Sequence, residues 1–290
     1  MGLPYFISPM LAVLGSPFDS GDYIYELKWD GYRALLFRET GSYRLMSRNS
    51  VDLSDHYPEL KFLSALPEGI VLDGELVAFV NGKPDFESLR SGNRDAKTHI
   101  VYFVFDLLYK NFESQMMLPL MERKKQLENV LSPYLQEQLV LNQYIETHGK
   151  LFFEKVKAQG LEGIIAKDKM SLYIPGKRED AWKKIKRSLE IYCVVIGFTP
   201  GDNGIGFKNL ILASDINGQL TYVGRVGTGF SQKFKEELFQ SMQRLIVNTP
   251  IIPCPAQGVW IKPEFICKIR YAEFTNTGVL RAPVFKSLAA

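Results

Sequence analysis

The stretch that decides the fold and the function of this chain covers residues 23–33 and reads YIYELKWDGYR. Its apolar first half predicts a strand ending near Lys28, after which Gly31 lets a backbone approach a ligand closely and Arg33 offers a fork for phosphate. A lysine amine attacks only after losing a proton, which its ordinary pKa of about 10.4 opposes at neutral pH. A surface lysine at a strand end is the simpler interpretation, so the rest of the chain must supply activating neighbours.

The composition is that of a globular protein without a membrane segment. Of 290 residues, 46% are hydrophobic and 23% are charged, and the length allows two domains. No apolar run is long enough to cross a bilayer, and the N-terminus lacks the basic segment of a secretory signal. The three cysteines form no CxxC pair, which favours reduced thiols in the cytoplasm and argues against a zinc site.

Positive charge is concentrated in a few segments. The net charge of +3 is too small to establish nucleic-acid binding. Lysines and arginines nevertheless gather at 167–187 and again at 262–270, a distribution that suits a polyanionic partner. A solvated basic face explains the same pattern equally well from charge alone.

Residues up to about 188 predict an α+β domain. Strands are expected at 23–29, 34–38, 44–47, 70–80, 101–108, 163–167 and 182–185. Asn81-Gly82, directly after the fourth of these strands, is a strong hairpin signal. Helices are expected at 121–131, after Pro119, and at 150–159, where apolar residues recur at helical spacing.

The pattern changes near residue 188, so we divide the chain into domains 1–188 and 189–290. Short strands are expected in the second domain at 191–198, 210–214, 220–226, 259–261 and 266–274. One helix interrupts them, from an N-cap at Ser231 to about Leu245. Five short strands with one helix predict a small β-barrel such as an OB-fold.

Charged residues near strand ends are candidates for phosphate chemistry. Glu75 and Glu162 could hold Mg²⁺, which proteins bind with one or two carboxylates plus water and phosphate oxygens. Exposed hairpin acids are the simpler interpretation of both. Lys184 and Lys186 would share one face of a strand, where they could grip a phosphate and favour the neutral form of a neighbouring lysine. Phe105, inside an apolar run, is by itself best interpreted as core.

These separate signals gain weight from their order. The blocks are KWDGYR at 28–33, SRN at 47–49, DGE at 73–75, FVFDLL at 103–108, EGIIAK at 162–167 and WKKIK at 182–186. This is the ordered motif set of covalent nucleotidyltransferases, and the chain resembles ATP-dependent DNA ligases, most of all the ligase module of bacterial end-joining proteins and their stand-alone relatives. The resemblance continues through PMLA at 9–12, YPEL at 57–60, YIPGKR at 173–178, YVGRVGTGF at 222–230 and RAPVFK at 281–286.

The resemblance implies a fold and a reaction. The fold is an α+β nucleotidyltransferase domain, with antiparallel sheets and flanking helices, followed by an OB-fold. Lys28 would attack the α-phosphate of ATP, form lysyl–AMP and release pyrophosphate. The AMP would then pass to the 5′-phosphate of a nick, from which the 3′-hydroxyl displaces it. ATP is the expected substrate and Mg²⁺ the expected cofactor, with Mn²⁺ as an alternative metal.

The resemblance also implies roles for individual residues. It makes Phe105 the aromatic that stacks on adenine, against its interpretation as core, and Glu75 and Glu162 the acids near the ribose and the metal. The expected nucleotide contacts are Glu26, Leu27, Arg33, Arg48, Glu75, Phe105, Lys184 and Lys186. The expected DNA or phosphate contacts are Arg48, Arg178, Lys262, Arg281 and Lys286.

Partners and location follow from the same resemblance. We expect nicked or broken duplex DNA as the substrate, end-joining bridging proteins as further partners, a monomer, and a nucleoid-associated place in the bacterial cytoplasm. The family's last motif continues beyond RAPVFK into a charged tail that orients pyrophosphate, whereas this sequence ends at Ala290. Without the tail, Lys286 and Arg281 would have to serve alone, and self-adenylation is the step that we expect to be most affected. The sequence shows no extra DNA-binding, polymerase or nuclease domain, so we expect a minimal core.

Two other interpretations stay open. RNA ligases and mRNA-capping guanylyltransferases share the Lys-x-Asp-Gly core, and exchanging GTP for ATP and RNA for DNA would separate them; the block at 222–230 argues against both. A non-catalytic clamp would bind DNA ends with steep salt dependence but seal only pre-adenylated ends. The intact Lys28 and acidic motifs argue against that clamp.

Overall fold

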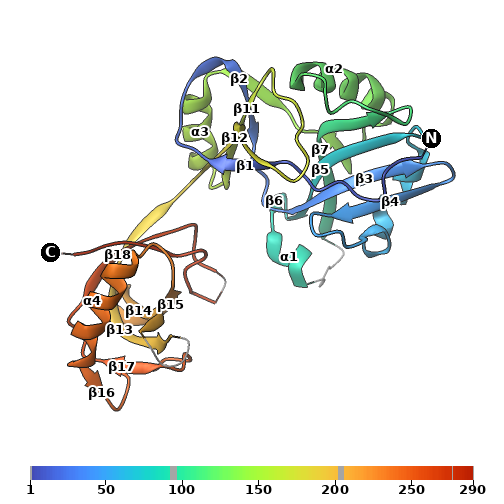
Figure 1. Ribbon diagram of the computed structural model, residues 1–290. Coiled ribbons are helices and arrows are strands. Elements are labelled where there is room, and N and C mark those ends of the chain that lie inside the picture. Colours follow the sequence, from blue (N-terminus) through green and yellow to red (C-terminus); the bar gives the residue numbers. More distant parts are fainter. Residues whose placement is uncertain (1, 92–96, 202–205, 276, 290) are drawn as a thin grey trace. The chain divides into compact units, whose positions relative to one another are not determined.

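The computed structural model describes residues 2–91, 97–201, 206–275 and 277–289. Its contacts divide the chain into two units, Met1–Lys186 and Arg187–Ala290, close to the boundary expected at residue 188 (Figure 1). Each unit has a hydrophobic core of its own. Within the described ranges, no helix is long and apolar enough to span a membrane.

The first unit contains a seven-stranded sheet. Its main path is β4 (Ser42–Ser47), β3 (Tyr32–Glu39), β5 (Ile70–Val80), β7 (Thr98–Lys110) and β8 (Glu113–Ser114). The short strand β6 (Lys83–Pro84) pairs with β5, and β9 (Leu139–Leu141) runs parallel to β7. One face packs against the 3₁₀ helix η2 (Pro58–Ala65) and the helix α2 (Leu120–Leu131). The shorter helical elements are η1 (Ser54–His56), α1 (Phe86–Ser91) and η3 (Ser132–Tyr134).

A second, five-stranded sheet completes this unit. Its order is β1 (Leu11–Leu14), β12 (Arg178–Lys186), β11 (Gly163–Asp168), β2 (Ser20–Leu27) and β10 (Tyr144–Thr147). All neighbours pair antiparallel except β1 and β12. Helix α3 (Gly149–Ala158) covers one face, because its apolar side chains Phe153 and Val156 pack with Tyr25, Ile164 and Ile185 (Figure 1).

Strand β3 is buried on both faces, so its residues alternate between two cores. Ala34 and Leu36 pack into the core beneath the helices. Leu35 and Phe37 pack into another core, which also contains Trp182 of strand β12. This second core therefore joins the seven-stranded sheet to the five-stranded one.

The second unit is built around one long strand. Strand β13 (Leu189–Pro200) pairs with β14 (Phe207–Ile216), β17 (Val259–Ile261) and β18 (Ile266–Tyr271). The seven-stranded sheet is completed by β15 (Gln219–Val226), β16 (Ile246–Val247) and β19 (Val284–Leu288). Helix α4 (Gln232–Gln243) buries Leu238 and Met242, and its N-cap Ser231 accepts a hydrogen bond from the Phe234 amide, as expected.

The sequence-based elements are largely confirmed, with two kinds of correction. The strand expected at 70–80 is β5 to the residue, and both expected helices of the first unit form within one residue of their predicted bounds. The strand expected at 266–274 ends at Tyr271, because the chain then turns back and the Thr275 amide donates to Val279. The strands β1, β9, β10, β16 and β19 were not predicted, since each has only two to five residues.

Candidate active site

A cavity of about 260 Å³ lies in the first unit, with walls from both of its sheets. Strand β2 of the five-stranded sheet leads directly into Lys28 on the wall, and the Lys28 amide donates to the Gly163 carbonyl at 3.0 Å. The expected residues on its lining are Glu26, Leu27, Lys28, Arg33, Arg48, Glu75, Phe105, Arg178, Lys184 and Lys186. The structure thus brings together side chains from Glu26 to Lys186 that are far apart in the sequence.

Lys28 does not stand alone on this wall. Its Nζ atom lies 2.5 Å from Oε2 of Glu162, and Oε1 of the same carboxylate lies 2.6 Å from Nζ of Lys186. One carboxylate therefore joins two ammonium groups. The sequence led us to expect like-charged neighbours for Lys28; the structure adds an acid between them.

Positive charge exceeds negative charge at this end of the cavity. Burial lowers the pKa of Lys184, and the nearby charges of Arg178, Lys186, Lys28 and Arg48 lower it further. Such a group of cations around a cavity favours an anion with several charges. Arg48 and Arg178 are both exposed, and the Arg178 guanidinium donates to the Ala12 carbonyl at 2.6 Å.

Arg33 makes a different contact from the one its sequence suggested. Its Nε and Nη2 atoms each lie 2.5 Å from an oxygen of the fully buried Asp73, and Nη2 also donates to the Met10 carbonyl. Tyr173 donates a further hydrogen bond of 2.6 Å to Asp73. The forked edge of the guanidinium thus holds a protein carboxylate, which leaves Nη1 for any contact with a nucleotide.

Gly31 also has a role other than the expected one. A Cβ atom at this position would lie 2.1 Å from the Leu76 carbonyl oxygen. Gly31 therefore allows its own backbone to lie close to strand β5. It is not part of the cavity lining, so it makes no room for a ligand there.

Phe105 belongs to the core and to the cavity wall at the same time. It is 7% exposed, packs edge-to-face against Trp182 and lines the cavity. Nζ of Lys167 lies 4.2 Å from the ring centroids of both Phe105 and Trp182, and the Arg33 guanidinium lies 4.7 Å from that of Phe105. Phe105 is therefore both a core residue and a residue that a ligand in the cavity would contact.

Glu75 carries the most perturbed carboxyl group of the cavity. Burial raises its pKa to about 7, against the opposing effect of Lys28 and Arg33. None of the described residues donates a hydrogen bond or forms an ion pair with this carboxylate. A partly desolvated carboxylate without a partner, beside a cationic cavity, fits Mg²⁺, which uses one or two protein oxygens and completes its shell with phosphate and water. Among the residues that the structure describes, no group of three or more His, Cys, Asp or Glu side chains is arranged to hold a metal ion.

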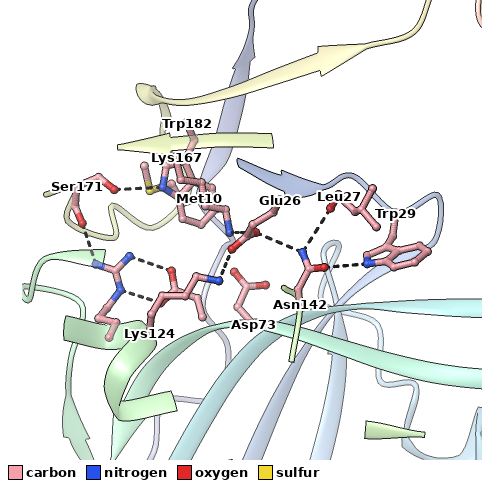
Figure 2. Close-up of polar contacts among 12 residues, drawn as sticks. Met10, Glu26, Leu27, Trp29, Asp73, Lys124, Asn142, Lys167, Ser171 and Trp182 are labelled. Carbon is pink, nitrogen blue, oxygen red and sulfur yellow. Dashed lines mark hydrogen bonds and ion pairs between the residues drawn. The ribbon is translucent and has the colours of Figure 1, made fainter. Parts of the chain in front are cut away.

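The polar contacts that join several lining residues of the cavity were not predicted (Figure 2). The Glu26 carboxylate is 1% exposed and forms ion pairs with Lys124 and, at 2.8 Å, with Lys167. Asn142 donates to the same carboxylate and accepts from Trp29. Lys167 stood inside a recognisable motif, but nothing in the sequence around Asn142 marks it as part of a site.

The other expected DNA contacts belong to the second unit. Lys262 and Lys286 are exposed there, and Arg281 forms an ion pair of 2.6 Å with Glu273. These three residues belong to a unit other than the one that contains the cavity.

Comparison with known proteins decides the family. The family model for an ATP dependent DNA ligase domain matches residues 9–186, and the one for an ATP dependent DNA ligase C terminal region matches residues 203–289. The chain belongs to the ATP-dependent DNA ligase family. Both sheets of the first unit and the whole cavity lie within the first match.

Relatives of this ligase chain include bacterial end-joining proteins. The multifunctional non-homologous end joining protein LigD of Mycolicibacterium smegmatis is 32% identical over 98% of this chain, and that of Pseudomonas aeruginosa is 32% identical over 99%. The chain spans only 38% and 36% of the length of these two proteins. The SPbeta prophage-derived DNA ligase-like protein LigB of Bacillus subtilis is 30% identical, with 97% of this chain and 98% of that protein covered.

Solved structures of similar ligases support the same family assignment. The ligase domain of Mycobacterium tuberculosis LigD has 31% identity and a TM-score of 0.58, and covers 98% of this chain and 95% of that domain. A mycobacterial DNA ligase D complexed with ATP and MES has 31% identity and a TM-score of 0.59, with the same coverage.

Proposed function

We propose that this chain is an ATP-dependent DNA ligase that seals nicks or breaks in duplex DNA through a lysyl–AMP intermediate, in DNA repair by end joining. The observation that carries the proposal is the position of Lys28. Its amine lies on the wall of a cavity where Arg48, Arg178, Lys184 and Lys186 gather. A triphosphate would neutralise that charge and bring its α-phosphorus to the amine.

The reaction requires little covalent chemistry from the protein. The Lys28 ammonium first loses one proton to water, and its nitrogen then forms a bond to the α-phosphorus while the bond from that phosphorus to the bridging oxygen breaks. Pyrophosphate leaves, and the nitrogen loses a second proton to water. The ion pair with Glu162 has to open for this attack. The nucleotide is then transferred to a DNA 5′-phosphate, and the 3′-hydroxyl displaces AMP. Positioning and charge neutralisation account for the acceleration.

Nucleotide binding would use the rest of the cavity. Phe105 provides an aromatic wall for adenine, and Glu26 and Leu27 lie on the lining one and two positions before the nucleophile. Lys184 and Lys186 would contact the α-phosphate, and Arg33 would reach the nucleotide through its remaining nitrogen. Glu75 and Glu162 would hold Mg²⁺, which when bound neutralises phosphate charge.

DNA contacts would come from both units. We assign residues 1–188 to a nucleotidyltransferase domain and 189–290 to an OB-fold, whose antiparallel sheet and helix α4 have the composition of such a barrel. Arg48, Arg178, Lys262, Arg281 and Lys286 are the proposed DNA or phosphate contacts. Bridging proteins of end joining, a monomeric state and a place at the nucleoid stay predictions.

A labelling experiment tests this function. Incubation with α-labelled ATP and Mg²⁺ should give an acid-labile adenylate, which a nicked DNA duplex discharges as the nick is sealed. Lys28→Ala should abolish the label, while Lys125→Ala, at an exposed lysine of α2, should not change it. Labelling with GTP instead, or sealing of RNA alone, would favour a capping enzyme or an RNA ligase. Label that persists in Lys28→Ala would refute the proposed nucleophile.

A further inference from the structure

Asn142 contacts the segment that carries Lys28 at three points (Figure 2). Its Nδ2 atom donates to Oε2 of Glu26 and to the carbonyl oxygen of Leu27, both at 3.3 Å. Its Oδ1 atom accepts a hydrogen bond of 2.9 Å from the indole Nε1 of Trp29. The contacts therefore bracket the nucleophile on both sides.

The position of Asn142 is itself fixed by the other sheet. Asn142 directly follows β9, which pairs in parallel with β7. Its backbone N–H donates a hydrogen bond of 2.8 Å to the Val104 carbonyl of β7. Val104 immediately precedes Phe105, which lines the cavity. Asn142 is 6% exposed, so its hydrogen bonds are shielded from water and hold the side chain in one orientation.

The chemistry of the amide explains why this side chain suits the place. A carboxamide offers two donor hydrogens and an acceptor oxygen, and here the donors meet two oxygens while the oxygen meets an N–H. The Trp29 ring is also stacked on Phe103, at 4.2 Å between centroids and 22° between planes. The segment after β2 is thus held to the seven-stranded sheet by a hydrogen-bonded amide and a stacked ring.

We propose that Asn142 is a positioning residue for self-adenylation, which holds the Glu26–Trp29 segment so that the Lys28 amine is directed at the α-phosphate. The inference rests on the proposed ligase function. Asn142 acts through the backbone and side chains beside Lys28 and forms no bond to the reacting atoms. It affects the step in which Lys28 is the nucleophile, and has no such role when the 3′-hydroxyl attacks a DNA that is already adenylated.

The test compares these two steps in the full chain. Asn142→Ala should slow single-turnover adenylation by ATP about tenfold to a hundredfold, because small misplacements of a reacting group have costs of this size. Sealing of a pre-adenylated nick should change less than about threefold, well below that range. Gln143→Ala, at the exposed neighbouring position, is the matched control and should leave both rates unchanged.

A second variant tests the same hydrogen bond with a smaller change to the packing of the domain. Trp29→Phe removes only the Nε1 donor and keeps an aromatic ring to stack on Phe103. It should slow adenylation less than Asn142→Ala does, and the double variant should be little slower than Asn142→Ala alone, because both changes break the same contact.

The outcomes separate the inference from the proposed function. If the unaltered chain forms no adenylate, the ligase proposal fails. If it does, and Asn142→Ala adenylates at the same rate, the positioning role is overturned. An equal loss in both steps together with a lower melting temperature would also overturn it, since that pattern belongs to a residue that serves stability alone.

Discussion

Glu162 lies between two lysines, with one carboxylate oxygen 2.5 Å from Nζ of Lys28 and the other 2.6 Å from Nζ of Lys186. The acid and the nucleophile are 134 positions apart in the chain. The pair comes together because β11 lies between β2 and β12 in the five-stranded sheet, so that the segment before β11 runs beside the ends of both neighbours. The same carboxylate can therefore orient the amine and, in our proposal, bind the metal.

Replacing this carboxylate should impair self-adenylation. Glu162→Gln keeps the shape of the side chain but removes its charge, so we expect a decrease of about a hundredfold, typical for the loss of one electrostatic group in an active site. Single-turnover labelling with ATP measures the rate. Glu154→Gln, at an exposed acid of α3 paired with Lys157, is the control. Equal rates for the two variants would contradict a role for Glu162.

The Glu75 carboxyl should make metal dependence sensitive to pH. Its pKa is raised by burial to about 7, so the ionised form that binds Mg²⁺ is scarce below pH 6 and dominant above pH 8. The Mg²⁺ concentration for half-maximal adenylation should therefore fall as pH rises through about 7. Glu75→Gln should need more Mg²⁺ and lose this pH dependence. A titration of rate against Mg²⁺ at several pH values tests both, and an unchanged pH dependence in the variant would refute the assignment.

The same shift predicts an effect on stability. In the unfolded chain the carboxyl ionises near its ordinary pKa of 4.5, so between pH 4.5 and about 7 the folded state binds more protons than the unfolded state. The contribution of the protonated Glu75 carboxyl to the free energy of unfolding is complete below pH 4.5 and is lost as pH rises through about 7. Without Mg²⁺, Glu75→Gln should therefore raise the free energy of unfolding at pH 8 and change it little near pH 4.5. Urea unfolding at the two pH values measures this, and a variant less stable at pH 8 would contradict it.

The buried pair of Asp106 and Arg123 should be important for stability. Both side chains are fully buried, and the guanidinium donates two hydrogen bonds to the carboxylate, of 2.7 and 2.9 Å. Removing one partner leaves a buried charge without compensation, so Arg123→Ala should lower the free energy of unfolding by about 3–5 kcal/mol. Urea unfolding should show this loss, while Lys125→Ala, on the exposed side of α2, should stay close to the unaltered chain. A loss below about 1 kcal/mol would show that the pair is dispensable.

Phe105 should separate packing from nucleotide binding. Phe105→Leu retains an apolar side chain in the core but removes the aromatic face, and stacking on a base contributes about 1–3 kcal/mol. We expect ATP to bind about tenfold more weakly or worse, with a melting temperature close to that of the unaltered chain. Equilibrium binding of ATP measures the first and thermal unfolding the second. Unchanged ATP affinity would show that Phe105 serves only in the hydrophobic core.

The sequence determined the elements whose pattern is local. Strand β5 and helices α2 and α3 follow from apolar runs and helical spacing, which depend on neighbours in the chain. The motif blocks indicated in the same way that Lys28, Glu75 and Lys184 belong to phosphate chemistry, and the structure places all three on one cavity. Residue type and order were sufficient to group these three residues in one site, and their roles in phosphate chemistry stay predictions.

Only the tertiary structure decided which groups face one another. Arg33 appeared free to bind phosphate, but the pairing of β3 with β5 brings it against Asp73, 40 positions away. Asn142 has no signal in its own segment, because its partners Glu26, Leu27 and Trp29 lie more than 110 positions earlier. Such contacts depend on the register between strands and on how two sheets pack, and both arise only when the whole domain folds.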